Sequence, residues 1–366
     1  KGSGGYHFID CNDGGATFKI FRCDGALPKY GPDLPLGDDL KQFYTPRFPW
    51  NTVDSKRPPF SFEIYQFADG GALLSVTGPH SITDGSSFWQ FMSHWTRIHR
   101  GESINTPPPG RDNLLKTGEQ YLEHAHEYKL VYEPGWGERL RLYIRLAGQM
   151  LGGMKSEVFR IPVACLRQWS AEAEGGDAAS APNLVGLYCL KVLSPHFRSA
   201  AERRIGIVFD LRHKRQLGIP ADYVGNALGY GEALYSAEEL ATQPLALLAR
   251  KCKPSRHDIS AERLRALLGL MESYRRRKAV WKLMLKPVAD GLDTGILLNN
   301  CTLLPVYDAD FGTGRPSWHD IFGVMFRMVL LHTTPENDGS IDIHLSAPRR
   351  EIEAFRRAHA ALLAAA

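Results

Sequence analysis

The 366-residue sequence has no long hydrophobic run. A transmembrane helix needs about 18 or more consecutive apolar residues, so we expect no membrane span and no membrane partner. No secretory signal is visible either. The opening letters, "KGSGG", are typical of an internal or expression-derived beginning rather than of a targeting segment.

Cysteine is sparse and unpaired in the sequence. The six cysteines are scattered, and none forms a CxxC pair. In a chain of this length, that distribution favours reduced thiols over a disulfide framework, and it predicts a cytoplasmic protein. The cysteines are Cys11, Cys23, Cys165, Cys189, Cys252 and Cys301.

A strong charge of one sign is also missing. The net charge is +4, and 23% of residues are charged, which does not indicate a dedicated nucleic-acid binder. No Walker loop, GxGxxG or GxSxG occurs. With 43% apolar residues, the chain has the composition of an ordinary globular protein, long enough for two domains or one large one with a sizeable core.

Three stretches alternate in the manner of β-hairpins around Asn/Asp-Gly turns. They span residues 6–21, 59–78 and 322–348, with turns at Asn12–Gly15, Asp69–Gly71 and Asn337–Gly339. Between the first two lies a Pro- and Gly-rich stretch, residues 28–59, which we expect to be an ordered surface loop. Further strands are expected over 202–212 and 295–312.

Helical periodicity follows Gly85. Five apolar residues fall on one predicted helical face, and Gly101 is a natural C-terminal stop; they are Phe88, Phe91, Met92, Trp95 and Ile98. Further helices are expected over 138–151, 184–197 and 348–364, and residues 236–286 are largely helical and basic, whereas 171–183 is a loop. Because strands and helices mix in both halves, we predict two α/β layers.

The stretch "HSITDG" joins an apolar strand to the helix that follows Gly85. Asp84 or Ser86 can cap that helix, which places His80 on the connecting turn. Histidine is the side chain best suited to proton transfer near neutral pH. A structural histidine beside a helix cap is the alternative. A metal site of His80 and Asp84 is disfavoured, because the pair is not on a regular helix face and no third ligand stands out; we expect no metal.

This stretch and three others resemble one enzyme family. "HSITDG" before an aromatic amphipathic helix resembles the HxxxDG motif of the acyl-CoA-dependent acyltransferases. These include chloramphenicol acetyltransferase, peptide-synthetase condensation domains and the BAHD acyltransferases. "LPVYDADFGTGRPSW", a little over 220 residues later, resembles the BAHD signature DFGWG and its flanks. "FDLRHKRQLGIPADYVGNALGYG" and "HFIDCNDGGATF" resemble two further BAHD stretches, and all four stand in family order.

The resemblance implies a fold. We expect two chloramphenicol-acetyltransferase-like α/β domains, each a mixed sheet flanked by helices, with an active-site channel between them. The expected boundaries are 1–155 for the domain with HxxxDG, 156–185 for a crossover, and 186–366 for the domain with DFGTG. In the family, an N-terminal strand and helix precede the first hairpin. Their absence leaves open a short chain or a missing leading segment.

The resemblance also implies a reaction, the transfer of an acyl group from a coenzyme A thioester to a hydroxyl or amine of a small molecule. His80 matches the family's general base. Asp84 matches an aspartate that turns away from the substrate and pairs with an arginine, here Arg212, and Gly85 is expected to permit a tight turn and close helix approach. Coenzyme A is then a co-substrate, and no tightly bound cofactor is expected.

Other matched positions have less certain roles. Asn299 and Asn300 occupy the family's Ser/Thr-Ser positions and are candidate hydrogen-bond donors to the oxyanion. Thr313 replaces the usual tryptophan near the acceptor side. A structural role near the coenzyme channel is expected for Asp310, Phe311, Gly312 and Gly314. The basic stretches 212–215 and 274–282 are candidate contacts for the coenzyme A phosphates, although solvated charge is the simpler interpretation for each residue.

Two alternative functions remain open. One is a related enzyme that takes its acyl group from a carrier protein, although Pro79 stands where condensation domains have a second histidine. The other is a non-catalytic binding relative. We expect a monomer in specialised metabolism, and we interpret His124 and His126 as surface residues.

Overall fold

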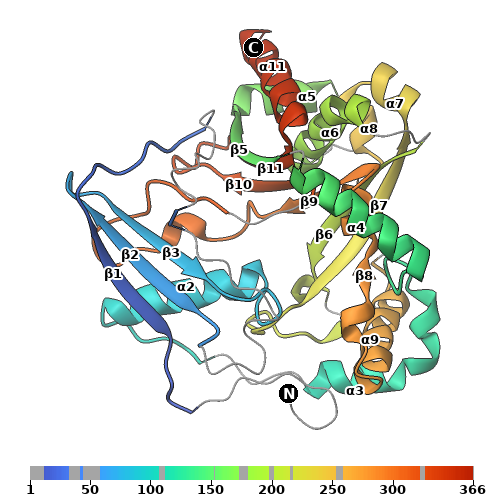
Figure 1. The fold of residues 1–366 in the computed structure, drawn as a ribbon, viewed down its shortest axis with the longest axis horizontal. Helices are drawn as coiled ribbons and strands as arrows, with labels where there is room; N and C mark the ends of the chain where they lie inside the picture. The colour runs from blue at the N-terminus through green and yellow to red at the C-terminus, as the bar shows by residue number, and fades with distance from the viewer. Residues whose placement is uncertain are drawn as a thin grey trace.

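The computed structural model describes residues 12–32, 42–43, 58–106, 112–151, 153–172, 180–197, 202–214, 217–252, 259–321 and 326–365. In this part of the chain, a three-stranded sheet and a six-stranded sheet lie side by side, and helices cover the larger one (Figure 1). A two-stranded ribbon of β4 (Val131–Tyr132) and β8 (Met284–Leu285) completes the sheets. Among the described residues, no helix has the length and apolar content needed to cross a bilayer.

The small sheet contains β1 (Thr17–Cys23), β2 (Ser61–Phe67) and β3 (Ala72–Thr77). β2 and β3 are antiparallel and turn at Gly70, which has a φ of +85°, so the second predicted hairpin is confirmed. β1 pairs in parallel with β2. The strand predicted to precede Asn12 in the first hairpin lies outside the described residues, as does most of the loop predicted over 28–59.

The large sheet has the strand order β5-β11-β10-β9-β6-β7. β9 is parallel to both of its neighbours, and the other pairs are antiparallel. The predicted hairpin of β10 and β11 is confirmed, with Asn337 and Gly339 at positive φ in its turn. The strands are β5 (Met154–Ile161), β6 (Glu202–Asp210), β7 (Leu228–Ser236), β9 (Gly295–Asn300), β10 (Met328–Thr333) and β11 (Ile341–Pro348).

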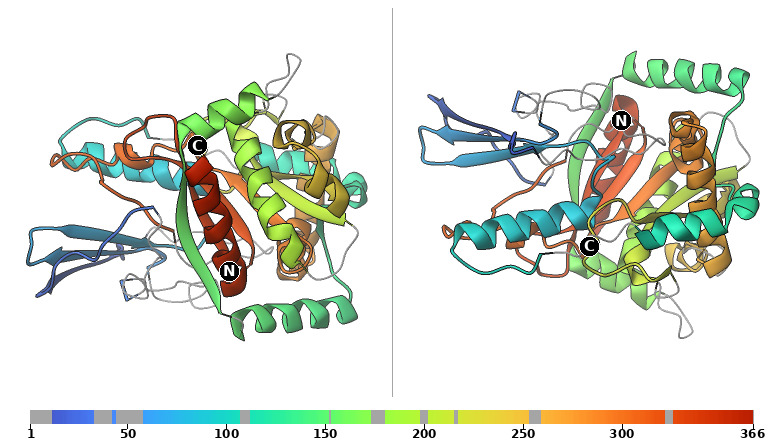
Figure 2. Two further views of the ribbon diagram at one scale, coloured as in Figure 1. Left: turned by 90° about the horizontal axis from the view of Figure 1, so that it is seen from above. Right: turned by 90° about the horizontal axis from the view of Figure 1, so that it is seen from below.

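The two faces of the large sheet differ in chemistry. The outer face carries aliphatic residues such as Ile205, Val329 and Ile343, which pack with α6 and α11 in the main core (Figure 2). Side chains alternate along a strand, so the inner face carries the intervening residues. Val158 on this face packs with Phe67 of β2, which brings the small sheet against it. The inner face is therefore the one nearest the HxxxDG turn.

Helices form largely where periodicity predicts them. The α-helices are α2 (Gly85–His99), α3 (Asp112–Gln120), α4 (Trp136–Leu151), α5 (Val163–Ala171), α6 (Ala181–Leu193), α7 (Ala237–Thr242), α8 (Leu245–Ala249), α9 (Ala261–Arg276), α10 (Lys286–Gly291) and α11 (Arg349–Ala365). Single 3₁₀ turns are η3 (Leu122–Glu127), η4 (Ser194–His196), η5 (Leu211–His213), η7 (Val280–Lys282) and η8 (Val306–Asp308). Most of the loop predicted over 171–183 lies outside the described residues.

The buried face of α2 differs from the predicted one. Phe91 and Ile98 are 44% and 55% exposed, whereas Trp89, which the apolar periodicity omitted, is buried with Met92. The described neighbours of Trp89 and Met92 include Val306 and Tyr307 of the 304–311 segment. The 304–311 segment therefore determines which face of α2 is buried. That face is rotated around the helix from the predicted apolar face.

Residues after 153 supply every strand of the large sheet. The stretch expected as a crossover, 156–185, contains most of edge strand β5 and the whole of α5. We propose, on this pattern, that the two domains meet near residue 153.

Candidate active site

The HxxxDG stretch forms a turn at the N-terminus of α2. The backbone N–H of Ile82 donates to the carbonyl of Pro79 at 3.0 Å, which closes the turn after β3. Asp84 caps the helix, since its Oδ1 accepts from the Ser87 N–H at 3.0 Å. His80 is exposed, whereas the Asp84 side chain is 0% exposed. The two ends of the motif therefore face different surroundings.

Asp84 and Arg212 form the predicted ion pair. Arg212 Nη1 donates to Asp84 Oδ2 at 2.9 Å, and Nη2 donates to Oδ1 at 3.1 Å. The Arg212 side chain is 3% exposed, so the fork is buried. A bidentate guanidinium–carboxylate pair fixes orientation as well as distance. The HxxxDG turn is thus locked to the end of β6, 128 residues away in sequence.

Arg212 uses its remaining donors on backbone and on a second carboxylate. Nε donates to the Tyr223 carbonyl at 2.9 Å, and Nη2 donates to the Gly225 carbonyl at 2.9 Å. Burial opposes its charge, but hydrogen bonds and attraction from Asp84 and Asp210 outweigh burial and raise the pKa of Arg212. Arg212 is therefore not available for a coenzyme A phosphate, which corrects that part of the prediction for 212–215.

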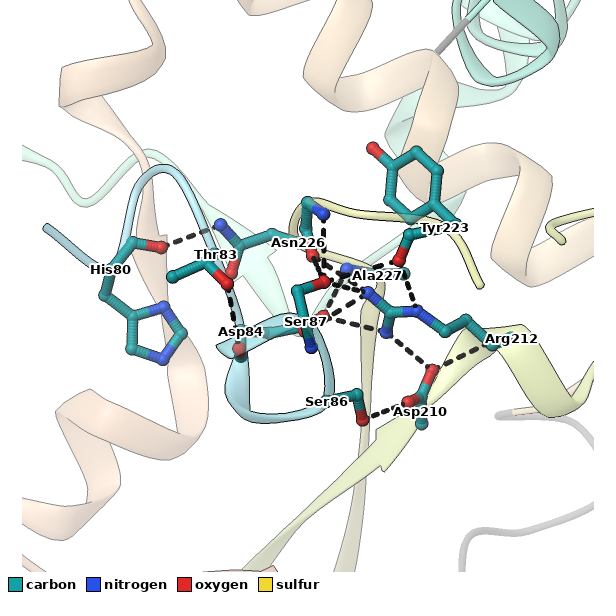
Figure 3. A network of polar contacts seen from close by, with 11 residues as sticks. His80, Thr83, Asp84, Ser86, Ser87, Asp210, Arg212, Tyr223, Asn226 and Ala227 are labelled. Atoms are coloured by element: carbon teal, nitrogen blue, oxygen red, sulfur yellow. Dashed lines mark hydrogen bonds and ion pairs between the residues drawn. The ribbon is translucent and has the colours of Figure 1, made fainter. Parts of the chain in front are cut away.

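The 223–227 loop holds the turn from the other side. Asn226 Nδ2 donates to the His80 carbonyl at 2.7 Å, and the Ala227 N–H donates to Asp84 Oδ2 at 2.8 Å. Figure 3 shows the His80 imidazole below this carbonyl, at the left of the Asp84–Arg212 network, with no dashed line drawn to the ring. The backbone of His80 is thus fixed while its ring stays accessible.

Sequence reasoning missed several members of this network. Ser87 Oγ accepts from the Gly225 N–H at 2.9 Å and from Arg212 Nη2 at 2.8 Å. Ser86 Oγ donates to Asp210 Oδ2 at 2.6 Å. The letters "FDLR" and "GN" lay within a recognised family stretch, but only the fold shows that Asp210 and Asn226 reach the turn.

Gly85 has a different role from the predicted tight turn. It is the first residue of α2, and it is not among the positive-φ residues. A Cβ at this position would lie 3.1 Å from Leu304 Cδ1. The absence of a side chain thus serves the predicted close approach, here between the helix and the 304–311 segment.

Asn299 and Asn300 end β9, an interior strand, beside the end of β6 that carries Asp210. Asn299 pairs with Val208, two residues before Asp210 in β6, and it lies on the inner face. Asn300 is exposed, and its Oδ1 accepts from the Thr302 N–H at 3.1 Å and from Thr302 Oγ1 at 2.7 Å. Asn300 is therefore engaged in a local turn, and Asn299 is the better oxyanion candidate.

The DFGTG loop lies at the other end of α2. Asp310 Oδ1 accepts from the N–H groups of Gly312 at 2.7 Å and Gly314 at 2.9 Å, and these bonds lower the pKa of Asp310. Phe311 packs edge-on against Trp95 at a centroid distance of 4.9 Å. Thr313 is exposed. Since His80 precedes the first turn of α2 and Phe311 contacts the third and fourth turns, the loop and His80 are about 15 Å apart along the helix.

The second basic stretch is largely paired within the protein. Arg275 and Arg276 both bind Glu272, and the Arg277 guanidinium stacks 4.0 Å from the Tyr274 ring centroid. These contacts favour a structural role for 274–282, and the contacts for coenzyme A stay unassigned. The His124 side chain is 53% exposed and pairs with Glu127, and His126 is exposed too, as expected for surface residues.

A family model places the chain in a class of enzymes. The model described as Transferase family matches residues 2–140 and 158–362. The chain therefore belongs to this family, the BAHD acyltransferases, and is an acyltransferase.

Known relatives agree with this assignment. A hydroxycinnamoyltransferase from Narcissus pseudonarcissus is 24% identical over 381 residues, covering 95% of this chain and 80% of the relative. A hydroxycinnamoyl-CoA:5-hydroxyanthranilate N-hydroxycinnamoyltransferase from Avena sativa is 24% identical over 362 residues, covering 95% and 78%. Among solved structures, F. graminearum TRI101 complexed with coenzyme A and deoxynivalenol has a TM-score of 0.66 at 14% identity, covering 93% of this chain and 80% of that one. That likeness shows the two-domain chloramphenicol-acetyltransferase-like fold.

Proposed function

We propose that the protein transfers an acyl group from an acyl-CoA thioester to a hydroxyl or amine of a small molecule, with His80 as general base. One observation carries the proposal. The turn that bears His80 is fixed by the Asp84–Arg212 pair and by Asn226, while His80 itself is exposed (Figure 3). A fixed backbone with an accessible ring suits a base that must meet a substrate.

The chemistry needs no covalent enzyme intermediate, since a thioester is already activated. The neutral His80 imidazole takes the proton of the acceptor O–H or N–H as the acceptor oxygen or nitrogen attacks the thioester carbonyl carbon. The tetrahedral intermediate then collapses, the C–S bond breaks, and the coenzyme A sulfur leaves with the proton from His80. A positioned base contributes about 10² to 10⁴ in rate.

The oxyanion of the intermediate needs a hydrogen-bond donor. We assign this role to the side-chain amide of Asn299. It lies on the inner face, near the end of β6 where Asp210 accepts hydrogen bonds from Ser86 and Arg212. Asn300 is the weaker candidate, because its side chain closes the turn with Thr302.

Coenzyme A as donor is supported by two related proteins, the F. graminearum TRI101 structure with coenzyme A and the Avena sativa hydroxycinnamoyl-CoA transferase. The latter is named for transfer to an amine, so amines belong in the acceptor panel alongside alcohols. Pro79 in place of a second histidine weighs against the carrier-protein alternative. We further propose a cytoplasmic monomer in specialised metabolism. Its five described cysteines are free thiols, which fits a reducing compartment.

A thiol-release assay tests the proposal. The protein and its His80→Ala variant are each given a panel of aliphatic and aromatic acyl-CoAs with pooled alcohol and amine acceptors. We expect acceptor-dependent release of coenzyme A, reduced about 10²- to 10⁴-fold in the variant because the base is removed.

The matched control is His126→Ala, which removes an exposed histidine outside the network. It should release coenzyme A at the wild-type rate. Release that persists unchanged in His80→Ala would exclude His80 as the base. If no pair of acyl-CoA and acceptor releases coenzyme A, but an acylated carrier protein serves as donor, then the donor is the carrier protein and not coenzyme A.

A further inference from the structure

Three histidines far apart in sequence meet between the two sheets. His332 lies on β10 and His344 on β11, both on the inner face, as diagonal neighbours because His332 pairs with Asp342 and His344 pairs with Leu330. His319 reaches them from the segment after DFGTG. The ring centroids are 5.0 Å apart for His319 and His332, 4.8 Å for His332 and His344, and 5.9 Å for His319 and His344.

Two of the three histidines are buried, and four ring nitrogens of the cluster lack hydrogen bonds among the described residues. His332 and His344 are 1% and 4% exposed. Within the described part of the chain, neither ring nitrogen of His332 has a hydrogen-bond partner, nor does Nδ1 of His319 or of His344. A neutral imidazole has one N–H donor and one acceptor nitrogen, so His332 leaves both unsatisfied. Buried polar groups are nearly always satisfied, and such an exception points to an ordered water or a bound ion.

We propose that His319, His332 and His344 bind a divalent transition-metal ion, of which zinc is the best fit. One ligand atom from each residue lies within 4.8 Å of the other two. Zinc–nitrogen bonds of 2.0–2.1 Å in a tetrahedron place ligand atoms about 3.4 Å apart. Each ring therefore needs to move inward by less than about 1 Å, which small side-chain rotations supply.

Asp320 lies beside the cluster in the arrangement that metal sites use. Its Oδ1 is 3.7 Å from His344 Nδ1 and has no hydrogen-bond partner among the described residues. Its Oδ2 accepts from Trp318 Nε1 at 2.9 Å, which holds the carboxylate in place. A carboxylate behind a ligating histidine fixes the ring and increases its basicity. Asp320 can serve this role, or it can turn inward as a fourth ligand.

The protonation of the cluster suits a metal as well. Burial lowers the pKa of His332 to about 4, and burial together with the neighbouring histidines lowers the pKa values of His319 and His344 well below their usual range. All three rings are thus neutral near pH 7, which is the form that ligates metal. Three imidazoles with one carboxylate favour zinc and its neighbours over calcium or magnesium, which prefer oxygen.

The sequence led us to expect no metal, so the proposed site departs from that expectation. The three histidines stand 13 and 12 residues apart, with no short motif, so only the fold reveals them. Trp89 of α2 lies 5.2 Å from the His319 ring, between centroids. A bound ion would therefore brace β10, β11 and the 318–320 segment beneath the helix whose first turn carries the catalytic motif.

Metal uptake by the purified full chain tests the inference without any assay of activity. The protein is treated with a chelator, dialysed, and titrated with Co²⁺ and then Zn²⁺. We expect saturable binding of one ion per chain, a visible d–d absorption from tetrahedral Co²⁺ that Zn²⁺ removes, and a rise in melting temperature with Zn²⁺.

Three variants and a control make the test specific. His344→Leu and His332→Leu should abolish uptake, and Asp320→Asn should weaken it by about 10- to 100-fold while leaving the ligating rings in place. The double variant His124→Ala/His126→Ala removes two exposed histidines and should bind as the wild type does. Circular dichroism confirms that each variant is folded. The inference fails if wild type and His344→Leu take up equal metal, or if only the His124/His126 variant loses it.

Discussion

At the scale of residues, one buried carboxylate satisfies four separate donors. Asp84 accepts from the N–H groups of Ser87 and Ala227 and from two nitrogens of Arg212. The pattern HxxxD indicated a helix cap and, through the family, a partner arginine. The Ala227 N–H could not be predicted, because it depends on how the 223–227 loop folds back over the turn.

Replacing Asp84 by Ala should both destabilise the fold and impair the reaction. The change leaves the Arg212 guanidinium buried without the fork, so we expect the free energy of unfolding to fall by about 3–5 kcal/mol. We expect kcat/KM to fall by about 10²-fold, since a base displaced by about 1 Å loses that much. Urea denaturation and acyl-transfer kinetics measure the two effects.

Glu102→Gln is the matched control for Asp84→Ala. Glu102 also pairs with arginines, Arg97 and Arg100, at the opposite end of α2, but these side chains are 27% to 44% exposed, unlike the buried Asp84–Arg212 pair. It should unfold at the same urea concentration as the wild type. If Asp84→Ala also unfolded at the wild-type urea concentration, the buried Asp84–Arg212 ion pair would not be what holds the turn.

At the scale of elements, turns and caps were the predictable features. The Asp69–Gly71 and Asn337–Gly339 turns and the start of α2 all follow from residues within a few positions of one another. The buried face of α2 was predicted only in part, since Phe88, Met92 and Trp95 pack in the cluster that covers it, whereas Phe91 and Ile98 are exposed. Apolar periodicity selected Phe91 and Ile98, but burial is decided by the 304–311 segment, more than 200 residues away.

The DFGTG loop offers a test of backbone strain within one element. Gly312 has a φ of +98°, and a Cβ there would meet little, with the nearest atom, Arg100 Cγ, at 3.9 Å. Gly312→Ala should nevertheless lower the free energy of unfolding by about 1–3 kcal/mol, because an L-residue is strained at that φ. Thermal and urea unfolding measure the loss.

Thr313→Ala in the same loop is the control for Gly312→Ala. Thr313 is exposed and is not among the positive-φ residues, so its truncation should leave the melting temperature unchanged. Equal stability of the two variants would mean that the loop relaxes freely around position 312, and that the glycine is not needed for its conformation.

At the scale of the whole molecule, long-range pairing is what the residues alone could not predict. The mixed α/β class followed from alternating strands and helices, and the two-domain fold followed from the family resemblance. The parallel pairing of β1 with β2, the order of the large sheet, and the meeting of His319, His332 and His344 each join segments that no local pattern links. The hydrogen bond from Asn226 to the His80 carbonyl is another long-range contact that no local sequence pattern predicts.

The outer layer of the large sheet should support the fold without affecting the chemistry. Glu351 of α11 is 0% exposed and binds Arg327 through two hydrogen bonds of 2.6 and 2.8 Å. Arg327 Nη1 also donates to the carbonyls of Gly291 and Asp293, at 3.2 and 3.3 Å, so this pair joins α11, β10 and the end of α10. The Glu351–Arg327 pair lies at α11, which covers the outer face of the sheet, whereas Asn299 lies on the inner face.

Glu351→Ala should therefore separate stability from activity, unlike Asp84→Ala. We expect the free energy of unfolding to fall by about 3–5 kcal/mol, because the buried Arg327 loses its partner, while kcat and KM stay unchanged below the melting transition. Glu353→Ala, which breaks an exposed pair with Arg349 on the same helix, should change neither quantity. If Glu351→Ala altered KM or kcat in the folded protein, the six-stranded sheet would transmit strain from its outer face to its inner face. The HxxxDG turn would then depend on the packing of α11 as well as on the ion pair between Asp84 and Arg212.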